Sequence, residues 1–206
     1  MISTSTSTST SVLKKIGLFF GSFNPIHIGH LILANYILEN SDMEELWFVV
    51  SPQNPFKDKK SLLSDHNRLD MVQLAIKNYP KIRVSNVEFS LPKPSYTIDT
   101  LTYLHEKYPE ISFSLIMGED NLESLGKWKN SEKLIENHHI IVYPRVFKEE
   151  KKDSEYLQHD NISMIKAPVI ELSATEIRNM IKSGKNVRPM LPPEVFEYLD
   201  GSNFYK

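Results

Sequence analysis

The chain has 206 residues, a formal net charge of −2 and no cysteine. This length can bury one sizeable core, so residues 12–206 are expected to form a single domain. The balanced charge disfavours a broad nucleic-acid-binding face, and the lack of cysteine excludes disulfides, thiolate catalysis and cysteine zinc sites. No apolar run reaches the roughly 18 residues of a membrane span. Together these features predict a cytoplasmic protein without nucleic-acid or membrane partners.

The N-terminal segment, residues 1–11, is dominated by alternating Ser and Thr. It has neither a basic start nor an apolar centre, which argues against a signal peptide. We interpret it as a disordered leader of low complexity. The alternative, an extended edge strand, is disfavoured because the segment has almost no apolar side chains to bury.

Apolar periodicity predicts strands and helices that alternate along the rest of the chain. Strands are expected at 12–20, 45–50, 81–84, 113–117, 139–143 and 162–166, and helices at 28–38, 64–77, 97–108, 131–136, 173–182 and 193–199. Ser64 is the expected N-cap of its helix, Gly184 should end the helix at 173–182, and the charged segment 148–160 should be a solvated loop. The pattern predicts a Rossmann-like α/β fold with a doubly wound, mostly parallel sheet and helices on both faces. Ligands of such sheets bind beyond the carboxyl ends of the strands.

The most informative motif is GSFNPIHIGH at residues 21–30, between the first strand and the first helix. Free N–H groups and the helix dipole at such a helix start suit phosphate. Gly21 permits a tight turn, and Gly29 costs about 1 kcal/mol relative to Ala, which a ligand passing close by would justify. His27 and His30 are three residues apart, so they can face the same way and hydrogen-bond the oxygens of a phosphoryl group in transfer.

The two histidines also allow two simpler interpretations. They could belong to a zinc site, but no third ligand lies at a recognised spacing. They could also be incidental turn residues. The order of strand, GSFNP, HIGH and amphipathic helix is more specific than either interpretation.

At these residues the chain resembles the nucleotidyltransferase superfamily with the HxGH signature, and GSFNPIHIGHL is most similar to the nicotinate-nucleotide adenylyltransferase family. The resemblance extends over nearly the whole chain from Lys14 and implies one nucleotidyltransferase domain at 12–206. It implies that His27 and His30 are catalytic and that Gly21, Ser22, Phe23 and Gly29 bind ATP. Asn24 stands where the family usually has Asp; it keeps the size and the oxygen but loses the charge, and it is assigned to the mononucleotide site.

The resemblance assigns two further segments before the middle of the chain. The loop at 51–57 (SPQNPFK) usually ends His-Lys in the family and here ends Phe-Lys; Lys57 is predicted to lie near the phosphates of the mononucleotide, unless it is only a solvated lysine. Arg68, in SDHNRLDM, is expected to be structural and outside the site. In SYTIDTL at 95–101, Thr97 is assigned to the mononucleotide pocket, although Thr97 or Asp99 could simply cap the helix.

Residues 117–122 (MGEDNL) match the family's GxDxL. Asp120 can accept hydrogen bonds from ribose hydroxyls or act as an N-cap, and Gly118 would let the nucleoside of ATP approach the backbone. The Trp128 indole, among Gly126, Lys127 and Lys129, is favoured as a stacking platform for a pyridine ring over a place in the core. Arg145 is assigned to the same mononucleotide.

The segment SATEIR at 173–178 resembles the family's second signature, ISSTxIR. Ser173 and Glu176 form a predicted capping box. A helix N-terminus, two hydroxyls and a guanidinium suit the β- and γ-phosphates of ATP, so Ser173, Thr175 and Arg178 are assigned to ATP. Ala174 replaces a family Ser and receives no role.

The resemblance implies an adenylyltransferase that forms deamido-NAD and pyrophosphate from ATP and nicotinate mononucleotide, with Mg²⁺ accompanying ATP and no metal site built by the protein. Nicotinamide mononucleotide or pantetheine phosphate as acceptor, and a cytidylyltransferase for a small phosphorylated alcohol, remain alternatives within the superfamily. A non-catalytic nucleotide-binding module is the alternative from another class. A homo-oligomer remains open.

Overall fold

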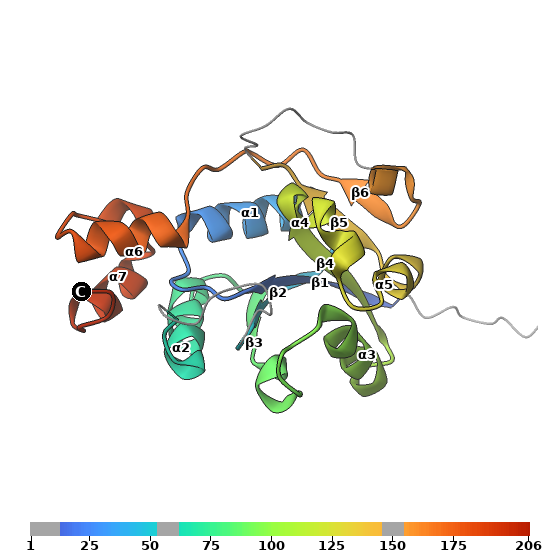
Figure 1. The fold of residues 1–206 in the computed structure, drawn as a ribbon, viewed down its shortest axis with the longest axis horizontal. Helices are drawn as coiled ribbons and strands as arrows, with labels where there is room; N and C mark the ends of the chain where they lie inside the picture. The colour runs from blue at the N-terminus through green and yellow to red at the C-terminus, as the bar shows by residue number, and fades with distance from the viewer. Residues whose placement is uncertain (1–12, 53–61, 146–154) are drawn as a thin grey trace, which may run out of the picture.

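A six-stranded parallel sheet forms the centre of the computed structural model, which describes residues 13–52, 62–145 and 155–206. Its strand order is β3-β2-β1-β4-β5-β6, and each of the five described strand pairings is parallel (Figure 1). The strands are β1 Lys14–Gly21, β2 Glu45–Val50, β3 Ile82–Ser85, β4 Ile111–Gly118, β5 Ile140–Tyr143 and β6 Ile162–Met164. The predicted Rossmann-like α/β fold is therefore confirmed.

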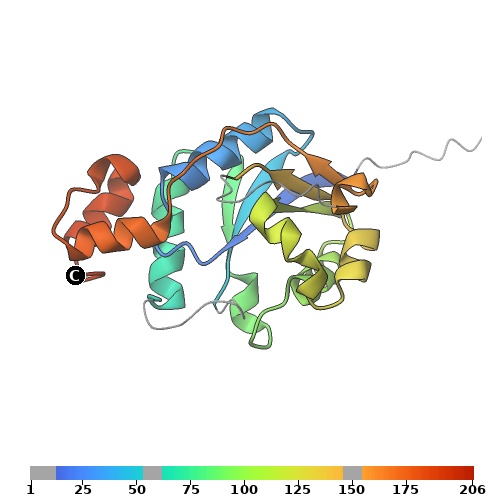
Figure 2. The same cartoon turned by 45° about the horizontal axis from the view of Figure 1, so that its top comes forward.

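Helices cover both faces of the sheet, and Figure 1 shows α1 and α3 on opposite sides of it. The α-helices are α1 Ile28–Glu39, α2 Asp65–Ile76, α3 Thr97–Lys107, α4 Glu119–Glu123, α5 Ser131–Asn137, α6 Ala174–Lys182 and α7 Pro193–Asp200. Short 3₁₀ turns are η1 Val87–Ser90, η2 Leu125–Lys127, η3 Glu155–Gln158 and η4 Arg188–Met190. Figure 2 shows α6 and α7 beside α2, at one end of the molecule.

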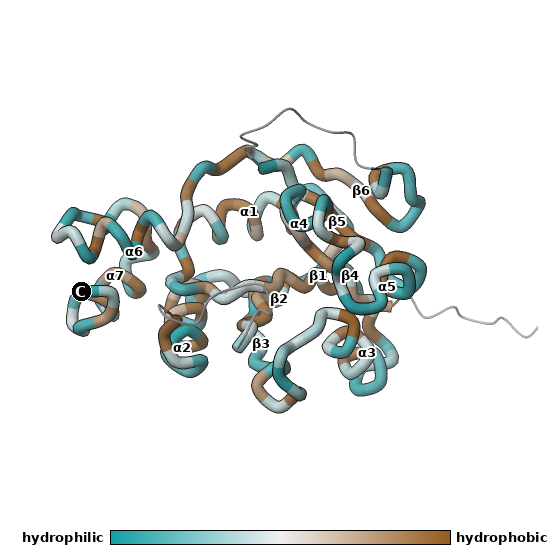
Figure 3. The backbone as a smooth tube through the Cα atoms, viewed as in Figure 1, coloured by the Kyte–Doolittle hydropathy of each residue, from teal (hydrophilic) through white to brown (hydrophobic). Residues whose placement is uncertain are grey.

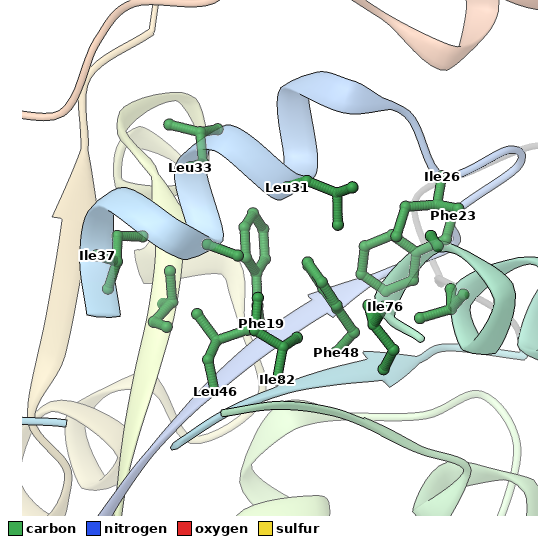
Figure 4. Packing of buried hydrophobic residues seen from close by; sticks show 14 of the residues in the cluster. Phe19, Phe23, Ile26, Leu31, Leu33, Ile37, Leu46, Phe48, Ile76 and Ile82 are labelled. Carbon is green, nitrogen blue, oxygen red and sulfur yellow. The ribbon is translucent and has the colours of Figure 1, made fainter. Parts of the chain in front are cut away.

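The strands are apolar throughout because both of their faces are buried. Neighbouring residues along β1 point to opposite faces: Phe19 joins the core under α1 and α2, whereas Leu18 joins the core under α3 and α5. Figure 4 shows the first core between α1 and the strands, and Figure 3 shows hydrophobic residues along the strands. This alternation holds the strand ends at fixed positions for the loops that follow them.

Most predicted elements are confirmed to within a few residues. Ser64 caps α2, since its Oγ accepts a hydrogen bond from the Asn67 N–H at 3.2 Å, and Gly184 follows α6 with a φ of +67°. The short elements η1, α4, η2 and η4 were not predicted, and residues 155–158 of the expected loop form η3. The leader at 1–11 and the rest of that loop up to residue 154 lie outside the described residues. Among the helices described, none has the length and apolar character needed to cross a bilayer.

Candidate active site

A cavity of about 500 Å³ opens at the carboxyl ends of β1 and β4. These neighbouring strands lead to helices on opposite faces, so the cavity occupies the topological switch point where ligands of open α/β sheets bind. Most of the predicted site residues line it: Gly21, Ser22, Phe23, Asn24, His27, His30, Thr97, Asp120, Trp128, Arg145, Ser173, Thr175 and Arg178. Residues 21–30, which include the two histidines predicted to be catalytic, are called the catalytic turn below. The lining residues of 95–98 and 127–129, which include Thr97 and Trp128, predicted to bind the mononucleotide acceptor, are called the acceptor end.

The two histidines of the catalytic turn stack at the start of α1. Their ring centroids are 3.8 Å apart with an interplanar angle of 29°. His27 is the N-cap residue, and its backbone N–H donates to His30 Nδ1 at 3.3 Å. Because His30 Nδ1 accepts this bond, the neutral form of the ring carries its proton on Nε2.

His27 is held in its neutral form. It is 5% exposed, and burial, with a smaller contribution from the Arg145 guanidinium, lowers the pKa of His27 to about 4. Its Nδ1 is buried and has no hydrogen-bond partner among residues 13–52, 62–145 and 155–206. A neutral imidazole at a helix N-terminus can hydrogen-bond a phosphate oxygen.

Two predicted ATP-binding glycines do not line the cavity but make room for side chains that do. A Cβ on Gly29 would lie 3.0 Å from His27 Nδ1, so the His27 ring, rather than a passing ligand, accounts for this glycine. A Cβ on Gly118 would lie 2.5 Å from Asp120 Oδ1 and 3.1 Å from Arg145 Cγ. Both glycines therefore serve the site through their neighbours.

The catalytic turn carries backbone strain at Phe23, whose φ is +44°. Such a conformation in a residue other than glycine costs on the order of 1–3 kcal/mol and persists only where the surroundings enforce it. The next residue, Asn24, is 4% exposed, and its Oδ1 accepts hydrogen bonds from the Leu63 N–H at 3.2 Å and the Tyr205 hydroxyl at 2.6 Å. One amide oxygen accepts both bonds, so neither needs the charge of the family's Asp.

Arg68 ties the loops at the strand ends to α2. It is fully buried, and its guanidinium donates to the backbone oxygens of Ser22 at 2.6 Å and Ser51 at 2.8 Å, and to Asp65 Oδ1 at 2.7 Å. It also donates to the Leu63 oxygen at 3.1 Å. The prediction that Arg68 is structural is confirmed.

The N-terminus of α6 faces the catalytic turn across the cavity. Ser173 caps the helix, since its Oγ accepts from the Glu176 N–H at 3.1 Å, which confirms this half of the predicted capping box. Arg178 donates to Thr175 Oγ1 at 3.2 Å and to the Asn24 backbone oxygen at 2.8 Å. The second of these bonds joins α6 to the turn that carries the histidines.

The acceptor end is built by the start of α3 and by η2. Tyr96 is the N-cap of α3 and makes no side-chain capping bond, so the suggestion that Thr97 or Asp99 caps this helix is wrong. Asp99 instead pairs with Lys129, with Nζ 2.8 Å from Oδ2. Trp128 is half-buried and lines the cavity while its inner side packs against the core under α3.

Charged groups at the mouth and the wall complete the site. Arg145 Nε lies 3.6 Å from Asp120 Oδ1, and burial raises the pKa of the neighbouring Tyr143 to about 12.

Lys57 lies outside the described residues. Sequence analysis missed Tyr143, Lys129 and Glu88, which also line the cavity, because no motif or spacing distinguishes them.

The comparisons with known proteins agree with this geometry. The family model described as Cytidylyltransferase-like matches residues 18–180, so fold and site define the chain as a nucleotidyltransferase of this class. Two relatives, from Flavobacterium psychrophilum and Flavobacterium johnsoniae, are called probable nicotinate-nucleotide adenylyltransferases; they are 55% and 56% identical over 192 residues, covering 93% of this chain and 99% of each relative. The chain belongs to the nicotinate-nucleotide adenylyltransferase family.

A solved structure shares the fold. It is the Plasmodium falciparum nicotinic acid mononucleotide adenylyltransferase complexed with NaAD, with a TM-score of 0.79 and 24% identity, covering 93% of this chain and 97% of that chain.

Proposed function

We propose that the chain joins the AMP part of ATP to the 5′-phosphate of nicotinate mononucleotide, forming deamido-NAD and releasing pyrophosphate. The observation that carries this proposal is the stacked His27–His30 pair at the start of α1, facing α6 across the switch-point cavity. The names of the relatives support the choice of acceptor. The proposal treats residues 12–206 as one nucleotidyltransferase domain acting in the cytoplasm.

The transfer is a direct displacement at the α-phosphorus of ATP. An oxygen of the acceptor's 5′-phosphate forms the new bond to phosphorus, and the bond from phosphorus to the oxygen that bridges to the β-phosphate breaks in line. The attacking oxygen is already anionic, so no general base is needed. Catalysis then consists of alignment and stabilisation of charge, with His30 and the neutral His27 donating to the α- and β-phosphate oxygens.

The remaining ATP contacts surround these histidines. Ser173, Thr175 and the Arg178 guanidinium, at the start of α6, would hold the departing pyrophosphate. Ser22 and Phe23 of the catalytic turn, and Asp120 after β4, would contact the rest of ATP. Together these groups hold both ends of the breaking bond in place.

Mg²⁺ would arrive as part of the ATP substrate. Within the described ranges, no three His, Asp or Glu side chains gather closely enough to hold a metal ion. The phosphate oxygens of ATP are the hard ligands that Mg²⁺ prefers. When bound to those oxygens, Mg²⁺ neutralises part of the charge of the leaving pyrophosphate.

The acceptor end would bind the pyridine mononucleotide. Trp128 offers a stacking face for the ring, and Arg145 and Lys57 offer positive charge for its anionic groups. Thr97 begins α3, whose first N–H groups lack a side-chain cap and can donate to an anion. Asn24 lines the cavity from the catalytic turn, where its Oδ1 accepts from Leu63 and Tyr205.

The test is pyrophosphate release by the purified full chain with Mg²⁺-ATP and one acceptor at a time. Release with nicotinate mononucleotide and not with nicotinamide mononucleotide supports the proposal. Comparable release with both keeps the reaction and withdraws the preference. Release only with pantetheine phosphate overturns the acceptor, and a folded chain that binds ATP but releases nothing with any acceptor favours the non-catalytic module.

The direct displacement has its own test. Labelled pyrophosphate is incubated with the chain and ATP in the absence of acceptor. We expect no label in ATP, because pyrophosphate leaves only when the acceptor attacks. Label in ATP without acceptor would reveal an adenylylated protein intermediate and contradict the mechanism.

A further inference from the structure

A buried carboxyl group lies in the cavity wall beside the acceptor end, outside every motif of the sequence. Glu88 is the second residue of η1, and its side chain is only 2% exposed. It lines the same cavity as His30 and Trp128. A carboxyl group this deeply buried requires either a partner or a function.

One oxygen of Glu88 is used within the protein and the other is not. Thr100 Oγ1, fully buried in the first turns of α3, donates to Glu88 Oε1 at 2.9 Å. Glu88 Oε2 and the neighbouring Ser95 Oγ are buried, and neither makes a hydrogen bond of ordinary geometry in the part of the chain that the structure describes, although the Ser51 and Ser95 hydroxyls lie close enough to act on the carboxyl electrostatically. Both residues line the cavity. The wall beside the acceptor end thus retains hydrogen-bonding capacity that a ligand can use.

The surroundings of Glu88 favour its uncharged form. Burial raises the pKa of the Glu88 carboxyl, and the hydroxyls of Ser51, Thr100 and Ser95 oppose this effect. These hydroxyls come from the end of β2, from α3 and from the segment before α3, and none of them carries a charge. A neutral carboxylic acid keeps one O–H donor, whereas a carboxylate only accepts.

We propose that Glu88 is a positioning residue that favours an anionic acceptor. In its neutral form, Glu88 supports the first turn of α3 through its bond with Thr100, and its second oxygen remains available to the cavity. In its ionised form, the Glu88 carboxylate repels the anionic group of the acceptor. This inference rests on the proposed function, because it takes the acceptor to be a pyridine mononucleotide. Nicotinate carries a carboxylate where nicotinamide carries an amide, so ionised Glu88 penalises nicotinate more.

The experiment measures the preference between the two pyridine mononucleotides as a function of pH. The KM for nicotinate mononucleotide and the KM or inhibition constant for nicotinamide mononucleotide are determined from about pH 5.5 to about pH 8.5. Their ratio cancels the titration of groups that both ligands share, including the 5′-phosphate. The full chain is compared with Glu88→Gln, which keeps the size, a donor and an acceptor, and with Glu106→Gln on the exposed side of α3.

We expect the preference of the unaltered chain for nicotinate to fall about tenfold as pH rises through the ionisation of Glu88, the effect of one added like charge. Glu88→Gln keeps the preference seen at low pH throughout. Glu106→Gln follows the unaltered chain. A Glu88→Gln variant whose preference still falls with pH would overturn the inference.

A second variant keeps the test decisive if Glu88→Gln does not fold. Thr100→Val removes the hydroxyl that favours the carboxylate, so the fall in preference should move to higher pH. If the preference of Thr100→Val for nicotinate falls over the same pH range as that of the unaltered chain, the role of Glu88 is contradicted. Failure of the proposed function looks different, since a folded, unaltered chain would then turn over neither mononucleotide.

Discussion

The two ends of the cavity are built on different physical principles. Behind the catalytic turn, the polar groups that hold the fold are buried and hydrogen-bonded, as for Arg68, which donates to the Ser22 oxygen, and for Asn24. At the acceptor end the charged pair Lys129–Asp99 is 43% and 45% exposed. Exposed ion pairs contribute little to stability, whereas buried bonds cannot be removed without a large loss. The fold and the proposed chemistry therefore depend on the same segment at the catalytic turn, whereas the exposed part of the acceptor end can be changed at less cost to the fold.

The largest expected effect is on turnover at the catalytic turn. His30→Ala removes a donor to the phosphate oxygens, so kcat should fall by about 10²–10³-fold, as for the loss of one transition-state donor. Steady-state pyrophosphate release measures this, and circular dichroism checks the fold. His66→Ala, exposed on α2, is the matched control and should leave kcat unchanged. A folded His30→Ala protein with near-normal turnover would defeat the assignment.

The second effect tests whether fold and site share residues. Arg68→Ala leaves the buried oxygens of Ser22 and Ser51 without their donor, so the free energy of unfolding should fall by about 3 kcal/mol. Urea unfolding measures this change. The control is Arg83→Ala, whose side chain is 62% exposed and pairs with Glu45. Equal losses for the two variants would contradict the contrast between buried and exposed polar groups.

The third effect separates burial from catalysis. Burial, with a smaller contribution from His105, lowers the pKa of His138 to about 4. The pKa of His27 is lowered to the same value, but His138 does not line the cavity. Between pH 6.5 and about 4, His138 is protonated in the unfolded chain but stays neutral in the folded chain. The free energy of unfolding is therefore highest above pH 6.5 and decreases as pH falls through this window.

His138→Leu should remove part of this acid sensitivity, on the order of 2 kcal/mol, while kcat at neutral pH stays unchanged. Chemical unfolding at neutral and acid pH measures the difference. His66→Leu, on the surface, should keep the acid sensitivity of the unaltered chain. A His138→Leu protein with unchanged acid sensitivity would show that His138 does not stay neutral in the fold.

The fourth effect falls on the acceptor end alone. Trp128→Ala removes the stacking face, so the KM for the mononucleotide should rise about tenfold while the KM for ATP stays within about twofold. Lys133→Ala, exposed on the nearby helix α5, is the control. Equal increases in both KM values would contradict a separate acceptor end.

The smallest effect concerns the link between the C-terminal residues and the catalytic turn. Tyr205→Phe removes a donor to Asn24 Oδ1, so the free energy of unfolding should fall by about 1 kcal/mol. Tyr198→Phe, whose hydroxyl makes a longer bond of 3.4 Å to Asn67, should change it less. A larger loss for Tyr198→Phe would contradict the importance of the Asn24 contact.

Features that depend on local sequence patterns could be predicted from the sequence, whereas features that depend on contacts between distant residues could not. The alternation of apolar runs predicted the parallel sheet, and the spacing of His27 and His30 placed both rings in one site. Gly29 was identified but misinterpreted, because the position of the His27 ring depends on the path of the catalytic turn. Glu88 was missed because its burial arises from contacts with residues before and after it in the chain, which no local pattern reveals.

The most direct measurement follows the α-phosphate of ATP. ATP labelled at this position is incubated with nicotinate mononucleotide, Mg²⁺ and either the unaltered chain or folded His30→Ala, and the products are separated. We predict that the unaltered chain moves the label into the dinucleotide and that His30→Ala does so at least about 10²-fold more slowly. A folded, unaltered chain that leaves all label in ATP, or a His30→Ala variant that transfers it at an undiminished rate, would contradict the account.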